Sequence, residues 1–256
     1  MILLYDGTFE GFLSVVFECY AHKIEPENIC SEEQFQEVLF AQKQFVPSNP
    51  EHSTRVWKGW QKKISREIDQ LPFLAFLSGE PGIEMKLLHF AKLAFASPVP
   101  VEGNYADPII LEIRKASRRV TQEAMRMLQF VRFQLTKDGF YFAAMRPRYD
   151  VLPMTLKHFR DRFADQQWVL YDLQRDYGFY YNLETIDEIT LDQKMFNLET
   201  GKAHNNILQE NEEAYQSLWN NYCHNITIRE RLNHKCQKNH MPKRYWKFLP
   251  EKGILK

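Results

Sequence analysis

The sequence is short of glycine, carries no net charge and has no long apolar run, and each absence excludes a class of protein. Only 10 of its 256 residues are glycine, below the usual share of about 7%. It contains neither a GxxxxGK[ST] phosphate loop nor a GxGxxG dinucleotide motif. No stretch approaches the roughly 18 consecutive apolar residues of a membrane-spanning helix. The 33 basic and 33 acidic side chains cancel, so no overall charge draws the chain to nucleic acid or to a membrane.

Cysteine is also scarce and is not spaced for chemistry. The four cysteines form neither a CxxC pair nor the CxxxCxxC that holds the iron–sulfur cluster of a radical-SAM enzyme. The N-terminal residues lack the basic flank and the small-residue cleavage site of a signal peptide. We therefore expect a reduced, cytoplasmic protein with free thiols and no cofactor. We also expect no metal, because the cysteines and histidines near the C-terminus lack the tight pairs of a zinc finger; they are Cys223, His224, His234, Cys236 and His240.

Charge is unevenly spread along the chain. Residues 1–96 hold 9 basic and 13 acidic side chains, whereas residues 201–256 hold 10 and 5. The last 28 residues, called the C-terminal segment below (residues 229–256), contain nine Lys or Arg against two Glu. A local basic surface can bind phosphate even on a neutral molecule, so this segment is a candidate for nucleic-acid binding.

Hydrophobic residues make up 44% of the chain, enough for a large core. In the first half, residues 2–5 predict a buried strand, and a helical spacing of apolar residues begins at Thr8. Asn49 before a proline predicts a helix start, and residues 83–96 are apolar almost all round, which favours a buried helix. The prolines of residues 97–108 indicate a boundary. It would separate a mainly helical part with a short first strand (1–105) from a helix-plus-sheet part with the basic C-terminal segment (106–256), although both can form one continuous domain.

The second half changes from helical to strand periodicity. An amphipathic helix is expected over residues 108–131. Two hairpins should follow, separated by a helix, because strand-like runs flank turn signals. We therefore predict an α+β fold whose antiparallel sheet is a ββαββ unit surrounded by helices. The expected strands are 132–135, 140–145, 168–172 and 178–182; the expected helices are 154–163 and 210–224, with short turns over 226–250.

Four cations share one face of the helix expected at 108–131, namely Lys115, Arg118, Arg119 and Arg126. Such a face can follow a phosphate backbone and release its counterions. Glu123 interrupts the row, so an ordinary solvated helix face is an equal alternative.

Two further motifs combine basic residues with aromatic rings. In HFRDRF at 158–163, His158 and Arg162 lie one helical turn apart and could bind a phosphate or carboxylate, although an ion pair of Arg162 with a neighbouring aspartate is slightly favoured. In YDLQRDYGFYY at 171–181, Arg175 and Tyr177 should be exposed at a hairpin turn and could stack on bases. Most of the other rings there are expected in the core.

The motif MPKRYWKFLPE at 241–251 places aromatic rings within a basic run. Positive charge and stacking together suit nucleic acid. The alternative is a tail whose rings anchor it while its charges stay in water, and both can hold together. The candidate contacts are Lys243, Arg244, Tyr245, Trp246 and Lys247.

Three motifs occur in a fixed order: YDGTFEGFL at 5–13, RYDVLP at 148–153 with HFRDRFADQQWVLYDLQRDYGFYY at 158–181, and MPKRYWKFLPE at 241–251. Together they resemble a bacterial family of DNA metabolism or DNA repair proteins, over essentially the whole chain. In that family the gene typically lies beside one for a radical-SAM DNA modification or repair protein, and elsewhere a similar domain is fused to a uracil-DNA glycosylase domain. The resemblance implies a DNA-related role and a radical-SAM partner. It supplies no catalytic residues.

Three functions fit these observations. The favoured one is an accessory protein of DNA metabolism or repair that binds nucleic acid and acts with a radical-SAM partner, which would bring the cluster that this chain lacks. The second is an enzyme that acts on DNA by acid–base or metal-assisted hydrolysis, with Asp6, Glu10, His158 or Asp172 as its chemical groups. The third is a scaffold that binds only the radical-SAM partner, through its many aromatic residues.

Overall fold

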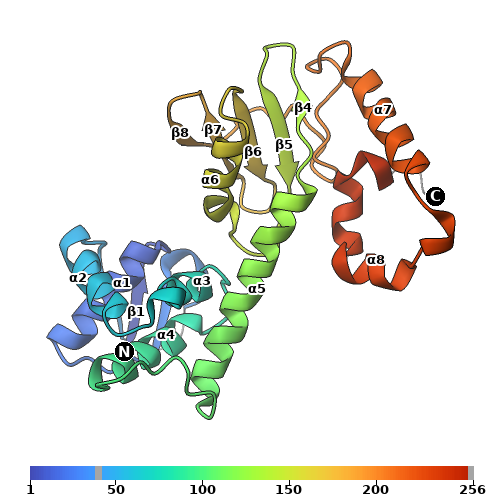
Figure 1. Ribbon diagram of the computed structural model, residues 1–256. Coiled ribbons are helices and arrows are strands. Elements are labelled where there is room, and N and C mark those ends of the chain that lie inside the picture. The colour runs from blue at the N-terminus through green and yellow to red at the C-terminus, as the bar shows by residue number, and fades with distance from the viewer. Residues whose placement is uncertain (38–41, 253–256) are drawn as a thin grey trace. The chain divides into compact units, whose positions relative to one another are not determined.

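The computed structural model describes residues 1–37 and 42–252 of the chain. The chain forms two compact units, residues 1–121 and 122–256. The long helix α5 (Pro108–Phe130) contains the division between them (Figure 1). Among the described residues, no helix combines the length and the apolar character needed to cross a bilayer.

The first unit contains a three-stranded parallel sheet. Its central strand is wholly buried, as four consecutive apolar or aromatic residues predict. Parallel neighbours require a crossover, and helix α1 provides it between the first two strands. The sheet has the order β2-β1-β3, with β1 at Ile2–Tyr5, β2 at Asn28–Ser31 and β3 at Lys43–Phe45. The helices are α1 (Phe9–Ala21), α2 (Pro50–Gln61), α3 (Leu71–Phe76) and α4 (Ile83–Ala96), with 3₁₀ turns at Glu32–Gln34 and Arg66–Ile68.

Side chains just before three helices fix where they begin. The Thr8 hydroxyl accepts the backbone N–H of Gly11 at 2.9 Å. Asn49 accepts two N–H groups at the start of α2, at 2.9 and 3.2 Å, which confirms the predicted cap. Asp107 does the same for α5, at 2.8 and 3.2 Å. These caps satisfy N–H groups that have no partner within the helix.

The second unit contains a five-stranded sheet of order β4-β5-β6-β7-β8. The predicted α+β fold is confirmed, with hairpins on both sides of a helix. The sheet is mostly antiparallel, as expected, and differs from the predicted ββαββ unit at one pair, because β5 and β6 run parallel. Helix α6 returns the chain to the starting end of the sheet, so the next strand runs in the same direction. The bounds are β4 Gln134–Leu135, β5 Tyr141–Met145, α6 Leu152–Arg162, β6 Trp168–Asp172, β7 Tyr177–Tyr181 and β8 Ile186–Ile189.

After β8 the chain is irregular over residues 190–211 and then becomes helical, and these helices lie beyond the β4 edge (Figure 1). Its first helix is tied to that edge by a buried glutamate, Glu212, which accepts the backbone N–H of Leu135 at 3.0 Å. Short turns make up the rest, as the sequence predicts. The elements are α7 (Glu212–Asn225), α8 (His234–His240) and 3₁₀ turns at Arg229–Arg231, Lys243–Phe248 and Pro250–Lys252.

Sequence patterns missed three strands: β2, β3 and β8. Each has only three or four residues, and none carries a continuous apolar run. They are edge strands, each held by backbone hydrogen bonds to a single neighbour: β2 and β3 pair with β1, which is distant in the sequence, and β8 pairs with β7, the strand just before it. Such pairing leaves little local signature.

Candidate nucleic-acid interface

A buried glutamate on α5, Glu123, joins two of the predicted motifs. Its side chain is only 1% exposed. One carboxylate oxygen accepts the backbone N–H of Arg148 at 2.8 Å. The other accepts from the guanidinium of Arg244 and lies 3.5 Å from Nη1 of Arg126. A carboxylate away from water needs such partners. Glu123 therefore holds both the RYDVLP motif and the C-terminal segment against α5.

The second hairpin joins the same cluster. Nη1 of Arg175 lies 2.9 Å from Oδ2 of Asp172, and its Nη2 donates to the carbonyl of Arg148 at 3.2 Å. The Tyr177 hydroxyl donates to the carboxylate of Asp150. Burial raises the pKa of Asp172, although Arg175 and two backbone N–H groups oppose the rise. Burial and the Asp150 charge also raise the pKa of Tyr177. Arg175 and Tyr177, which were predicted to be exposed at the turn, thus both bond to other side chains or backbone groups of the protein.

Tyr245 anchors the C-terminal segment. Its side chain is fully buried, and its ring lies 5.4 Å from that of Phe130 at the end of α5. Its hydroxyl accepts a hydrogen bond from Arg244 at 2.8 Å, and burial raises its pKa. Of the two roles expected for Tyr245, the structure therefore shows the anchor, and the ring offers no face to a base.

The residues around this anchor are cationic and accessible. Lys243 and Lys247 are exposed, and Trp246 is half-buried. The Trp246 ring has the ammonium groups of Lys243 and Lys252 at 6.0 and 5.1 Å from its centre, while its Nε1 donates to the carbonyl of Met241 at 2.9 Å. Within residues 1–37 and 42–252, none of these three lysines has an ion-pair partner. Their charge is available for an external anion.

The predicted basic face of α5 is partly used by the protein itself. Arg119 forms two hydrogen bonds to the Glu80 carboxylate, at 2.6 and 2.7 Å. Arg126 is half-buried beside the carboxylate of Glu123. Lys115 and Arg118 are exposed, so these two are the members of the face that point freely to solvent.

His158 and Arg162 are both exposed on α6. They line one side of a cleft of about 520 Å³. The neighbouring aspartate, Asp161, pairs with Lys157 and Arg160 at 3.0 and 3.3 Å. Among the described residues, Arg162 forms an ion pair with neither of the expected neighbours, Asp161 or Asp165, and the guanidinium remains available at the cleft.

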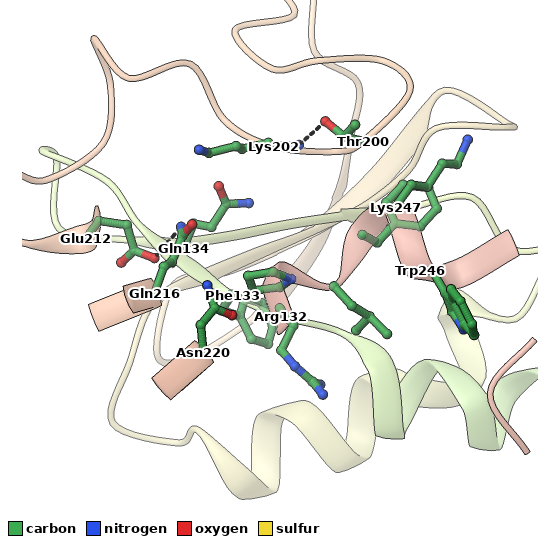
Figure 2. A pocket seen from close by; sticks show the side chains of 13 residues that line it. Arg132, Phe133, Gln134, Thr200, Lys202, Glu212, Gln216, Asn220, Trp246 and Lys247 are labelled. Atoms are coloured by element: carbon green, nitrogen blue, oxygen red, sulfur yellow. Dashed lines mark hydrogen bonds between the residues drawn. The ribbon is translucent and has the colours of Figure 1, made fainter. Parts of the chain in front are cut away.

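A pocket of about 440 Å³ adjoins the C-terminal segment, and the sequence motifs indicated only its wall at 246–250. Figure 2 shows Gln134, Glu212 and Gln216 grouped at one side, with Trp246 and Lys247 at the other. No single motif defines the pocket, because its walls come from four separate stretches of chain. They are residues 132–134, 200–202, 212–220 and 246–250.

A glycine brings one wall of this pocket close to the sheet. Gly201 has a φ of +66°, and a Cβ on it would lie 2.5 Å from the carbonyl oxygen of Ala144 on β5. Only glycine tolerates both this backbone conformation and this contact. The loop can therefore hold Thr200 and Lys202 against the sheet at the pocket (Figure 2).

The residues considered for hydrolysis of DNA occupy different settings. Asp6 and Glu10 belong to the first unit, and His158 and Asp172 to the second. Asp6 accepts three hydrogen bonds from nearby donors, and Asp172 is buried in its ion pair. In the described part of the chain, no three Cys, His, Asp or Glu side chains are grouped so that they could hold a metal ion.

Comparison with known proteins identifies the family but not a function. The model of a domain of unknown function, DUF4130, matches residues 81–251. That range includes α4, α5, the five-stranded sheet, the Glu123 cluster and the pocket. No curated protein and no solved structure matches the chain significantly. Because the match covers well over half of the sequence, the chain belongs to the DUF4130 family.

Proposed function

We propose that this protein binds nucleic acid as an accessory protein of DNA metabolism or repair and works with a radical-SAM partner. The observation that supports it best is a set of three lysines in the C-terminal segment that have no ion-pair partner among the described residues. They are Lys243, Lys247 and Lys252, around the half-buried ring of Trp246. A lysine without a carboxylate partner binds a phosphate without first losing an ion pair. Each phosphate neutralised releases counterions, which favours binding at low salt.

The anchoring of the segment strengthens this argument. Arg244 and Tyr245 hold the turn Lys243–Phe248 to α5, so its cations are positioned before a ligand arrives. A fixed site loses less side-chain entropy on binding than a flexible tail does. The roles divide within four consecutive residues: Arg244 and Tyr245 anchor, while Lys243 and Trp246 face the ligand.

The test is salt-titrated binding of purified protein to fluorescent single- and double-stranded DNA. For duplex DNA, the slope of log K against log salt should fall by about 1.8 in the double variant Lys243→Ala/Lys247→Ala, since each phosphate contact contributes about 0.9. Lys58→Ala is the matched control, because Lys58 is an exposed lysine of the first unit and should leave the slope unchanged. If the wild-type protein shows no salt-dependent binding, the proposal is wrong.

The Trp246 ring can be tested separately from charge. Stacking of one base on an aromatic ring contributes about 1–3 kcal/mol and depends little on salt. Trp246→Ala should therefore weaken binding to single strands while preserving the salt slope. Circular dichroism and thermal melting of the variant establish that the turn Lys243–Phe248 remains folded.

A separate surface supports the partner half of the proposal. Four large residues on one side of α7 are 40–63% exposed: Tyr215, Leu218, Trp219 and Tyr222. Their spacing of three and four residues forms a continuous apolar face. Such patches mark protein interfaces, where Tyr and Trp are enriched. We propose that this face binds the radical-SAM partner, which the scaffold alternative also requires.

The two halves of the proposal make different predictions. Leu218→Glu should abolish co-elution with the purified radical-SAM partner and leave the DNA salt slope unchanged. Asn221→Glu adds the same charge to the same helix outside the apolar face, and should preserve co-elution. A partner that binds both variants equally well would exclude this face as its docking site.

A further inference from the structure

Within the pocket, a buried carboxylate fixes the orientation of a glutamine. Oε2 of Glu212 accepts the N–H of Leu135, and Oε1 accepts Nε2 of Gln216, both at 3.0 Å. The Gln216 amide thus presents its nitrogen to Glu212. Its oxygen is then directed away from Glu212, as an acceptor of defined position at the pocket (Figure 2).

A second acceptor lies one helical turn further along α7. Oδ1 of Asn220 is buried and has no donor among the described residues. A buried acceptor without a partner costs about 1–3 kcal/mol, so the folded chain retains a polar group that a ligand with a donor would satisfy. Asn220 and Gln216 line the same pocket.

The remaining walls supply positive charge and aromatic surface. Lys202 and Lys247 line the pocket and are exposed, and neither pairs with a carboxylate in residues 1–37 or 42–252. Phe133 and Trp246 add ring surface. The volume of about 440 Å³ lies within the range of small-ligand sites, roughly 300–1,000 Å³. The acceptors can bind the edge of a base, the aromatic rings can stack on its face, and the cations can bind its phosphate.

We propose that this pocket binds one unpaired nucleotide of a nucleic-acid strand and selects bases that carry an exocyclic amino group. Gln216 and Asn220 accept from that amino group, while Lys202 and Lys247 neutralise the adjoining phosphates. Amide side chains pair with amino-bearing base edges by the same donor–acceptor logic in other nucleic-acid complexes. The inference rests on the proposed function, because Lys247 and Trp246 belong to both surfaces.

Single-stranded oligo-dC and oligo-dT of equal length are the probes, at pH 8. The two bases have similar size, but cytosine carries an amino group where thymine has a carbonyl oxygen. The wild-type protein should bind oligo-dC about tenfold more tightly, a discrimination typical of a good amide–base contact. Gln216→Ala and Asn220→Leu should each bring that ratio close to one. The salt slope should stay as in the wild type, because neither substitution removes a charge.

Asn221→Ala is the matched control, because Asn221 is an exposed asparagine next to Asn220 that does not line the pocket. It should retain the preference for oligo-dC, and thermal melts confirm that all variants are folded. Salt-dependent binding with equal affinity for both oligonucleotides would refute the pocket and leave the proposed function intact. A preference that survives both pocket substitutions would refute it as well. Absence of salt-dependent binding to any strand would overturn both proposals.

Discussion

Removal of Arg244 should cost more stability than its partly exposed position suggests. Its side chain is 43% exposed, but its partner Glu123 is 1% exposed. Without Arg244, the buried carboxylate keeps the N–H of Arg148 at 2.8 Å, the nearby hydroxyl of Tyr245 and Arg126 at 3.5 Å. Loss of one member of a buried pair costs about 3–5 kcal/mol. Because water reaches the Arg244 side of this pair, we expect about 2–3 kcal/mol for Arg244→Ala.

A double-mutant cycle isolates the interaction. Glu123→Gln retains an acceptor for the Arg148 N–H but carries no charge that Arg244 must balance. In that background, Arg244→Ala should cost about 1 kcal/mol, a typical value for one hydrogen bond. The coupling energy is then about 1–2 kcal/mol. The control cycle uses Arg160 and Asp161, which are 3.3 Å apart and 48% and 50% exposed, and should give about 0.2–1 kcal/mol.

Urea unfolding followed by circular dichroism gives the four free energies of each cycle. Hydrogen exchange over residues 241–249 shows whether the loss is local, since release of the C-terminal segment should accelerate exchange there first. If the free energies of the Glu123 and Arg244 variants add to within about 0.5 kcal/mol, the pair does not hold the C-terminal segment and this account of the site is refuted.

Three further outcomes are expected. Glu84 accepts a hydrogen bond from the Tyr5 hydroxyl at 3.1 Å, and burial raises the pKa of its carboxyl. The folded state therefore keeps a proton at pH values where the unfolded state has already released it. The free energy of unfolding should fall as pH rises above the pKa of Glu84 in the unfolded chain. Glu84→Gln should therefore raise the melting temperature at pH 8 and change it little at pH 4, and an equal effect at both would refute this. Burial raises the pKa of Cys19 to about 11, whereas Cys236 is exposed; iodoacetamide followed by mass spectrometry should label Cys236 first, and Cys19 only after unfolding. Gly201→Ala should destabilise the fold by about 1–3 kcal/mol in urea titrations, and a neutral result would show that the loop can move away from β5.

Local patterns in the sequence were sufficient for the long helices and for the two hairpins β4–β5 and β6–β7. The apolar run at 83–96 and the amphipathic period from residue 108 coincide with α4 and α5, because both helices bury faces that repeat every 3.6 residues. Asn49 and the turn at 136–139 act within a few residues of chain, so their neighbours in the sequence are also their partners in space. The basic character of the C-terminal segment is likewise a property of composition.

Tertiary structure alone decided strand direction and the use of each charge. Nothing local to β5 or β6 distinguishes parallel from antiparallel pairing; the crossover through α6 sets it. Arg244 and Lys243 are adjacent cations in the sequence, yet only Arg244 meets the buried carboxylate of Glu123, 121 residues away. The burial of Tyr245 and the gathering of Gln216 and Asn220 with the Trp246 turn depend on contacts between distant segments in the same way. Composition thus fixed how much charge and how many rings the segment has, whereas long-range packing decided which of them remain free to bind.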